Sequence, residues 1–113
     1  MSQFEEKLSE AMEAANVLGI PVDEDLLSKI AKGLGPALYN SDASLVSSSD
    51  QAELDRVKEN FLRGKLGCTN ESEMDQAIQY AIDTLGAGNR NKLRTLFYYL
   101  CVDKLNKASV YNH

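Results

Sequence analysis

Apolar residues recur three and four positions apart along most of this chain, which is the spacing that lines one face of an α-helix. No stretch alternates apolar and polar residues as a half-buried strand does. The spacing predicts helices over about residues 2–18, 23–34, 51–65, 70–85 and 90–105. The pattern therefore predicts an all-α fold, a compact single-domain bundle of about five helices with short loops, spanning residues 1–113.

The predicted helix boundaries rest on capping and helix-breaking residues. Four side chains stand where an N-cap is expected: Ser2, Asp23, Asp50 and Asn70. Three of these four have a glutamate three residues later, the spacing of a capping box. Helix ends are predicted at Gly19, Gly35–Pro36, Gly67 and Gly86. Residues 106–113 are expected to form a frayed tail, and the helix within residues 1–22 has the least specific pattern.

The stretch "NSDASLVSSSDQAEL" carries five serines and could be a reactive loop, a phosphorylation site, a linker or the start of a helix. Its end is interpreted as a helix start, because Asp50 precedes a clear apolar stripe. Leu45 and Val46 are expected to pack this loop onto the core, since a free linker would not need an apolar pair. Whether residues 41–49 have a regulatory role stays open.

Charge is distributed unevenly along a chain whose formal net charge is -5. Residues 1–25 hold seven acids against Lys7, whereas residues 86–113 hold five bases against Asp103. The acidic start can face the basic end within the molecule, or the basic end can bind an anionic partner.

A weak candidate interaction surface follows from this basic end: Arg90, Lys92, Arg94 and Tyr98. On a helix, Arg90, Arg94 and Tyr98 would lie near one another, so they could contact phosphates and stack on a base. The alternative is that the arginines pair with acids of the first or third helix. Three bases on an acidic protein make nucleic acid an unfavourable partner, and loss of either arginine is expected to have a mild effect on stability.

Few kinds of catalytic chemistry fit the residues available. The single histidine, His113, is the final residue of the sequence, so no Ser–His or Cys–His pair has an internal base. Cys68 and Cys101 are too far apart in sequence for a zinc or redox motif, and no phosphate or calcium loop is present. We expect no metal and no cofactor. Paired carboxylates remain an alternative if Asp42, Asp50 and Asp55 meet in space.

The sequence also bears on location. Phe4 is followed directly by two glutamates, so no leader peptide is visible, and no apolar run approaches the roughly 20 residues of a membrane helix. We expect a cytoplasmic protein with free thiols and no membrane contact.

The stretch "SLVSSSDQAELDRVKENFLRGKLG", followed near the end of the chain by "FYYL", resembles a family of small bacterial proteins known only as a domain of unknown function. The match covers roughly residues 23–105, is specific in "SLVSSSDQAELDRVKENFL" and is weak over the first helix. Gly64 stands where the family has a basic residue and is expected to fray the helix end. The resemblance implies a compact helical protein of the bacterial cytoplasm, and it implies no activity, cofactor or catalytic residue.

Three hypotheses about function remain. The leading one is a non-enzymatic protein that acts through contacts with a protein partner or with its own copy as a homodimer, using amphipathic tyrosines at an apolar groove. The second is a weak nucleic-acid-binding module that uses Arg90, Lys92 and Arg94. The third is an unrecognised carboxylate-based enzyme.

Overall fold

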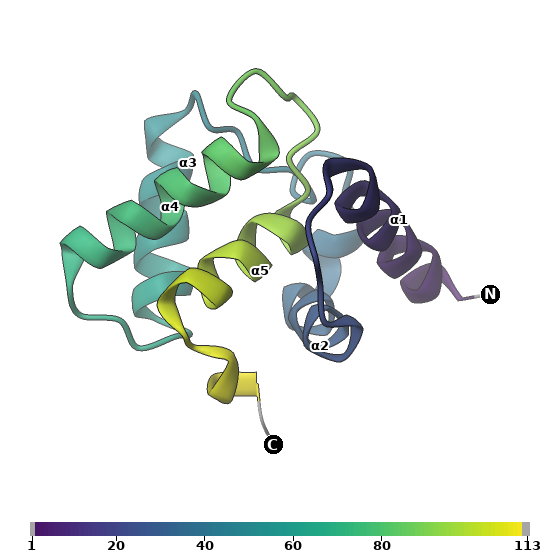
Figure 1. Cartoon of the computed structure of the whole chain (residues 1–113), viewed down its shortest axis with the longest axis horizontal. Helices are drawn as coiled ribbons and strands as arrows, with labels where there is room; N and C mark the ends of the chain where they lie inside the picture. Colours follow the sequence, from purple (N-terminus) through teal and green to yellow (C-terminus); the bar gives the residue numbers. More distant parts are fainter. Residues whose placement is uncertain (1, 112–113) are drawn as a thin grey trace.

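Helix α5 lies at the centre of the fold, with α3 and α4 on one side and α1 and α2 on the other (Figure 1). The structure is a computed structural model that describes residues 2–111. The α-helices are α1 (Gln3–Leu18), α2 (Glu24–Leu34), α3 (Gln51–Arg56), α4 (Glu71–Leu85) and α5 (Arg94–Leu105). Three other helical segments are η1 (Gly35–Tyr39), a 3-10 helix; η2 (Val57–Arg63), a π-helix that continues α3; and η3 (Ala108–Tyr111), a second 3-10 helix. Within residues 2–111 every regular element is helical, which confirms the all-α prediction.

The core is built around α5 because this helix is apolar on nearly every side. Seven of its residues are buried: Thr95, Leu96, Phe97, Tyr99, Leu100, Cys101 and Val102. They meet the apolar stripe of α4, which buries residues at helical spacing from Met74 to Leu85. Removing so much apolar surface from water supplies the main free energy of folding. Cys101 is fully buried, as its place in an apolar run predicts.

The four predicted caps all accept hydrogen bonds from amides of the first helical turn. The side chain of Ser2 binds the amide of Glu5 at 3.1 Å, and the side chain of Asn70 binds that of Glu73 at 3.1 Å. Asp23 and Asp50 each accept from two amides, the shorter bond being 3.0 Å in both cases. These bonds satisfy donors that have no partner within the helix, so they fix where each helix begins.

The last long helix begins later than the sequence predicts. We expected it to start at about Arg90, but α5 starts at Arg94, and Leu93 has extended backbone geometry. This extended backbone pairs with the serine-rich loop over residues 41–49, which we call the serine loop. The amide of Val46 donates to the carbonyl of Lys92 at 2.8 Å, and the amide of Arg94 donates to the carbonyl of Ser44 at 2.7 Å. This short antiparallel bridge takes the place of the first helical turn. Val46 is buried, so the loop packs on the core as predicted.

The third helix changes its hydrogen-bonding pattern halfway, which the apolar spacing did not predict. From Val57 onward it is π-helical, with a wider turn, and the amide of Gly64 reaches back five residues to the carbonyl of Glu59 at 3.1 Å. A side-chain carbon at Gly64 would lie 2.6 Å from the carbonyl oxygen of Asn60. Gly64 was expected to fray the end of this helix. In the structure, its lack of a side chain allows the backbone of the last turn to approach closely.

The expected frayed tail is wrong for the residues that the structure describes. Asn106 ends α5 in a left-handed conformation, and the amide of Lys107 donates back to the carbonyl of Val102 at 3.0 Å. The chain then forms η3, and the ring of Tyr111 is buried. Burial of the Tyr111 ring removes a large apolar surface from water, and this stabilises the folded conformation of residues 106–111. Residues 112–113, with the single histidine His113, lie outside the described residues.

Candidate functional site

Arg94 is the centre of the most extensive polar network in the described chain. Its guanidinium donates to the carbonyl oxygens of Ala43 at 2.6 Å and Leu45 at 3.1 Å, to the hydroxyl of Tyr98 at 3.1 Å, and to the carboxylate of Glu53. Only 13% of the Arg94 side chain and 14% of the Glu53 side chain are exposed. The network therefore ties α5 to the serine loop and to α3, as the interpretation of an arginine paired with the third helix predicts.

The charges of this network stabilise each other. Burial alone would raise the pKa of Glu53, but the hydrogen bonds from Arg94 and Arg56 bring it below its ordinary value. Burial alone would lower the pKa of Arg94, but the bond to Glu53 raises it above its ordinary value. Burial also raises the pKa of Tyr98. Both members of the ion pair thus stay charged over the whole neutral range.

The predicted basic surface does not form as one patch. Arg90 is exposed but precedes α5, so it does not lie one turn from Arg94. Lys92 is buried, and its ammonium donates to the carbonyl oxygens of Ala87 and Asn89. Arg94 is occupied by the network above. The patch does not form because carbonyl oxygens bind two of its three cations inside the fold. Those of the turn over residues 86–93 bind Lys92, and those of the serine loop bind Arg94.

A groove lies directly beside the Arg94 network, between α2, η1, η2 and α5. We call it the α2–α5 groove; its volume is about 360 Å³. Its lining residues are Ile30, Gly33, Leu34, Ala37, Ala43, Asn60, Phe61, Lys65, Arg94 and Tyr98. The rings of Phe61 and Tyr98 stack in parallel at 3.7 Å between centroids. Binding sites for small molecules have this size and this mixture of apolar walls with a few polar groups.

Sequence reasoning found only Arg94 and Tyr98 of this groove. Leu34 and Ala37 look like ordinary helix residues, and Asn60 and Lys65 look like the solvated face of the third helix. The one available signal was Gly33, because a glycine inside a helical pattern costs stability and often marks a close approach or a packing role. A side-chain carbon at Gly33 would meet nothing within 4 Å, so this glycine opens the groove.

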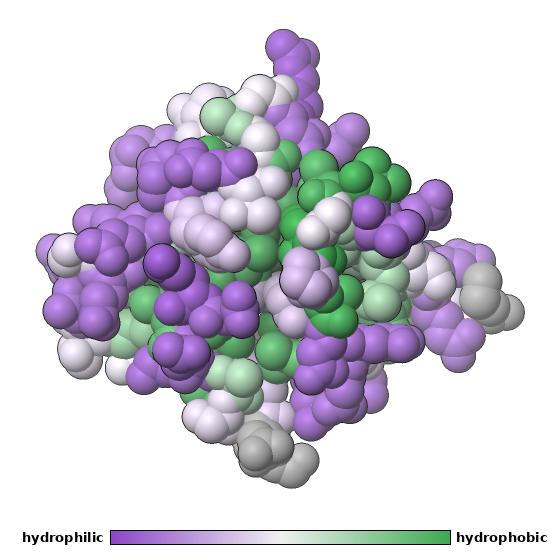
Figure 2. Space-filling view, in the orientation of Figure 1, coloured by the Kyte–Doolittle hydropathy of each residue, from purple (hydrophilic) through white to green (hydrophobic). Residues whose placement is uncertain are grey.

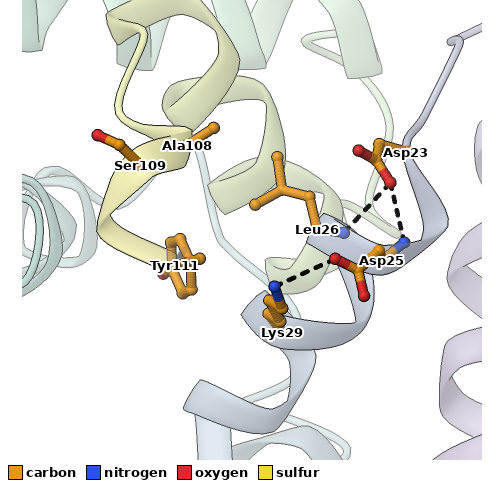
Figure 3. Close-up of a pocket in the computed structure, with 7 residues that line it drawn as sticks. All are labelled: Asp23, Asp25, Leu26, Lys29, Ala108, Ser109 and Tyr111. Carbon is orange, nitrogen blue, oxygen red and sulfur yellow. Dashed lines mark hydrogen bonds and ion pairs between the residues drawn. The ribbon is translucent and has the colours of Figure 1, made fainter. Parts of the chain in front are cut away.

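A second cavity lies where η3 meets the start of α2 (Figure 3). Its volume is about 280 Å³, and its three charged side chains already have partners. Asp23 caps α2, and Asp25 pairs with Lys29 at 3.1 Å. These charged groups are already used at the start of α2. The cavity therefore has fewer free polar groups for a ligand than the α2–α5 groove has.

A third cavity, of about 580 Å³, lies between the serine loop and the turn over residues 86–93. Asp42, three serines and Arg90 line it. The serine hydroxyls bond locally, as when Ser47 and Ser49 approach each other at 3.4 Å. Arg90 and Lys92 are the basic residues of the lining, and the ammonium of Lys92 donates to the carbonyl oxygens of Ala87 and Asn89 instead of to a serine hydroxyl.

The carboxylates considered for acid–base chemistry are exposed, and two of the three serve the local structure of α3. Asp50 caps α3, Asp55 accepts from the side-chain amide of Gln51 at 2.9 Å, and all three of Asp42, Asp50 and Asp55 are exposed. They lack the burial by which enzymes prepare a carboxyl group for proton transfer. Among residues 2–111 no group of three or more His, Cys, Asp or Glu side chains is placed to hold a metal ion. Cys68 and Cys101 are free thiols, and burial raises the pKa of both.

An exposed apolar patch stands at the end of α1. Val17 is 78% exposed and Leu18 is 42% exposed, and the half-buried Ile20 and Val22 follow in the connection to α2. Figure 2 shows hydrophobic surface gathered over this part of the molecule. We call these four residues the α1-end patch. Adjacent exposed aliphatic side chains of this kind are a feature of contact surfaces.

The fold defines a small all-helical protein whose surface carries a groove and an exposed apolar patch. The chain belongs to the family described as "Protein of unknown function (DUF2853)", whose family model matches residues 9–109. This confirms the family-level resemblance seen in the sequence. No curated protein matches the chain. Over residues 2–111, none of the helices has the length and apolar character that crossing a bilayer requires.

Proposed function

We propose that this protein acts through contacts with another protein, made at the α1-end patch, and that it performs no chemistry of its own. The observation that carries the proposal is the exposure of Val17 and Leu18, side by side at the end of a helix whose middle residues, from Leu8 to Ala15, supply its contacts with the core. Leaving two neighbouring aliphatic side chains in water costs free energy that a partner surface would recover.

The charge around the patch indicates the kind of partner. Residues 1–25 hold seven acids and one base, and Glu13 lies one turn before Val17 on the same side of α1. A partner with an apolar centre and a basic rim would fit this surface. Such a rim would steer the encounter, so the association should weaken as salt rises.

Self-association is the second candidate, supported by the same exposed side chains. A two-fold contact through the α1-end patch would place two acidic segments against each other. That repulsion would be screened by salt, so dimerisation should strengthen as salt rises. The two candidates therefore predict opposite responses to one variable.

Nucleic acid gains little support as a partner. Of the three bases considered, Arg90 alone is exposed without a role in the fold, and a single phosphate contact gives weak binding. A carboxylate enzyme likewise gains little support, since Asp42, Asp50 and Asp55 are exposed, and Asp50 and Asp55 serve local structure.

Sedimentation of the pure protein between about 50 and 500 mM salt tests self-association, the salt range spanning strong and weak screening. Purification from native cells, with the wild type, a Val17→Ser/Leu18→Ser variant and a Tyr39→Ser control, tests the partner. Tyr39 is 42% exposed and lies outside the patch. We expect a stoichiometric basic partner that is lost with the double variant and retained by the control. A partner retained equally by both variants would refute the role of the patch.

A further inference from the structure

We propose that the α2–α5 groove is a binding site for a small carboxylic acid with an apolar body. The apolar walls come from two sides: Ile30, Leu34 and Ala37 belong to α2 and η1, and the stacked rings of Phe61 and Tyr98 face them across the groove. A chain or ring of carbon atoms placed there would leave water on both faces. This site is separate from the α1-end patch, so the proposal stands apart from the proposed function.

The polar lining of the groove selects an anion. Two of its lining residues, Lys65 and Arg94, are basic, and none is acidic. This is unusual for a chain with 17 acids and 12 bases. Low-dielectric walls concentrate the field of such charges, which raises the local concentration of anions and disfavours cations.

Two of the polar groups are available to a ligand. Arg94 already makes four hydrogen bonds and is neutralised by Glu53, so its role is to fix the wall of the groove. By contrast, Asn60 and Lys65 are exposed, and among residues 2–111 neither the side-chain amide of Asn60 nor the ammonium of Lys65 has a hydrogen-bond or ion-pair partner. Lys65 lies over the ring of Tyr111 at 5.3 Å, a contact that holds the cation without using its hydrogen-bond donors. A carboxylate at the mouth of the groove can accept from both groups.

The backbone of the groove supplies an independent observation. Asn60 and Phe61 belong to the π-helical segment η2, and Gly64 at its end accommodates a contact that a side chain would forbid. π-helical turns are rare in proteins, and they occur frequently at functional sites. Here the unusual turn forms one wall of the groove.

Octanoate is a suitable probe because it joins a carboxylate to an eight-carbon body. Titration of the full chain with octanoate, followed by amide NMR, should give saturable shifts at Leu34, Asn60 and Lys65. Octylamine, which has the same body and the opposite charge, should bind at least tenfold more weakly to these residues, because Lys65 repels a second ammonium and no acidic residue lines the groove. Acetate, which has the charge without the body, should give no saturable shift.

Two pairs of variants separate the groove from general effects. Lys65→Gln removes the proposed anchor and should weaken octanoate binding about fivefold, the usual upper value for an exposed ion pair. Its control, Lys104→Gln, removes the same charge from a lysine that lies over another ring, that of Tyr80 at 5.4 Å. Gly33→Leu should fill the groove and abolish binding without disturbing the fold, since nothing lies within 4 Å of its added carbon. Its control, Gly88→Leu, adds the same side chain in equally open space outside the groove.

Each result either supports or overturns the proposal. Saturable shifts confined to the groove, weakened by Lys65→Gln and absent in Gly33→Leu, support it. Equal binding of octanoate and octylamine overturns the choice of an anion. Equal losses in Lys65→Gln and Lys104→Gln show that net charge, and not Lys65, controls binding. Unchanged binding in Gly33→Leu, or no saturable shift at groove residues, overturns the site itself.

Discussion

Replacing Arg94 with methionine should destabilise the protein severely, because the side chain holds together three elements that are distant in sequence. The change keeps the apolar stem and removes bonds to the carbonyls of Ala43 and Leu45, to Tyr98 and to Glu53. Four hydrogen bonds from a charged donor would total several kcal/mol if none were replaced. Breaking a buried ion pair costs about 3–5 kcal/mol when one charge remains without a partner.

The structure places the expected loss at the lower end of that range. Glu53 keeps a second partner, the guanidinium of Arg56 at 3.0 Å, so its carboxylate is not left alone. About one eighth of each side chain in the pair is exposed, which lets water replace part of what is lost. We therefore expect Arg94→Met to cost about 3 kcal/mol. This corrects the mild effect that the sequence alone suggests.

Urea unfolding followed by circular dichroism measures the loss, with Arg63→Met as the matched control. Arg63 also pairs with two partners, Glu59 at 3.1 Å and Glu71 at 3.4 Å, but its side chain is 38% exposed. Surface pairs of this kind contribute less than about 1 kcal/mol. A double-mutant cycle with Glu53→Gln should give a coupling of about 1.5 kcal/mol between Glu53 and Arg94. The reasoning fails if Arg94→Met costs no more than Arg63→Met, or if the coupling is zero.

Three further predictions concern stability. Asp50→Ala should lower the free energy of unfolding by about 1 kcal/mol through loss of the α3 cap, and an unchanged urea midpoint would contradict this. Gly64→Ala should destabilise the protein by about 1 kcal/mol or more, because its new carbon meets a carbonyl oxygen at 2.6 Å. Gly33→Ala adds a carbon in open space and should stabilise α2 by about 0.5–1 kcal/mol. Calorimetry must therefore show changes of opposite sign in the melting temperatures of the two variants. The pKa of Glu53 is lowered in the folded state, so its contribution is fully present above the ordinary value of about 4.3 and is lost as pH falls through the lower folded value. Melting curves from pH 6 to 3 should therefore be less pH-dependent in Glu53→Gln than in the wild type, and identical slopes would refute this.

The features that the sequence predicted well are those set by local chemistry. The caps at Ser2, Asp23, Asp50 and Asn70 depend on a side chain and amides two or three residues away, so spacing alone reveals them. Most helix boundaries follow from these caps. The pairing of Arg94 with an acid of the third helix was one of two open alternatives, and the sequence could not choose between them.

The features that were missed depend on contacts between distant segments. The late start of α5 results from pairing of Leu93 with Leu45, which helical periodicity cannot detect. Apolar spacing does not separate a π-helical turn from an α-helical one over a few residues, so η2 was also missed. Lys92 looks like an exposed base in the sequence and becomes buried only because carbonyl groups of its own turn surround its ammonium. Binding sites built from such contacts, like the α2–α5 groove, therefore escape sequence reasoning.

The central position of α5 has a consequence for how the chain folds during synthesis. This helix supplies seven buried residues, and it contacts α1, α2 and α4, all of which leave the ribosome before it. The earlier helices therefore emerge without the surface against which they pack, and the serine loop emerges without Arg94 to hold it. Folding must wait for residues 94–102 and then occur as one cooperative event. Until that point the apolar faces of the earlier helices are exposed together, which is the interval in which a chaperone would have most to bind.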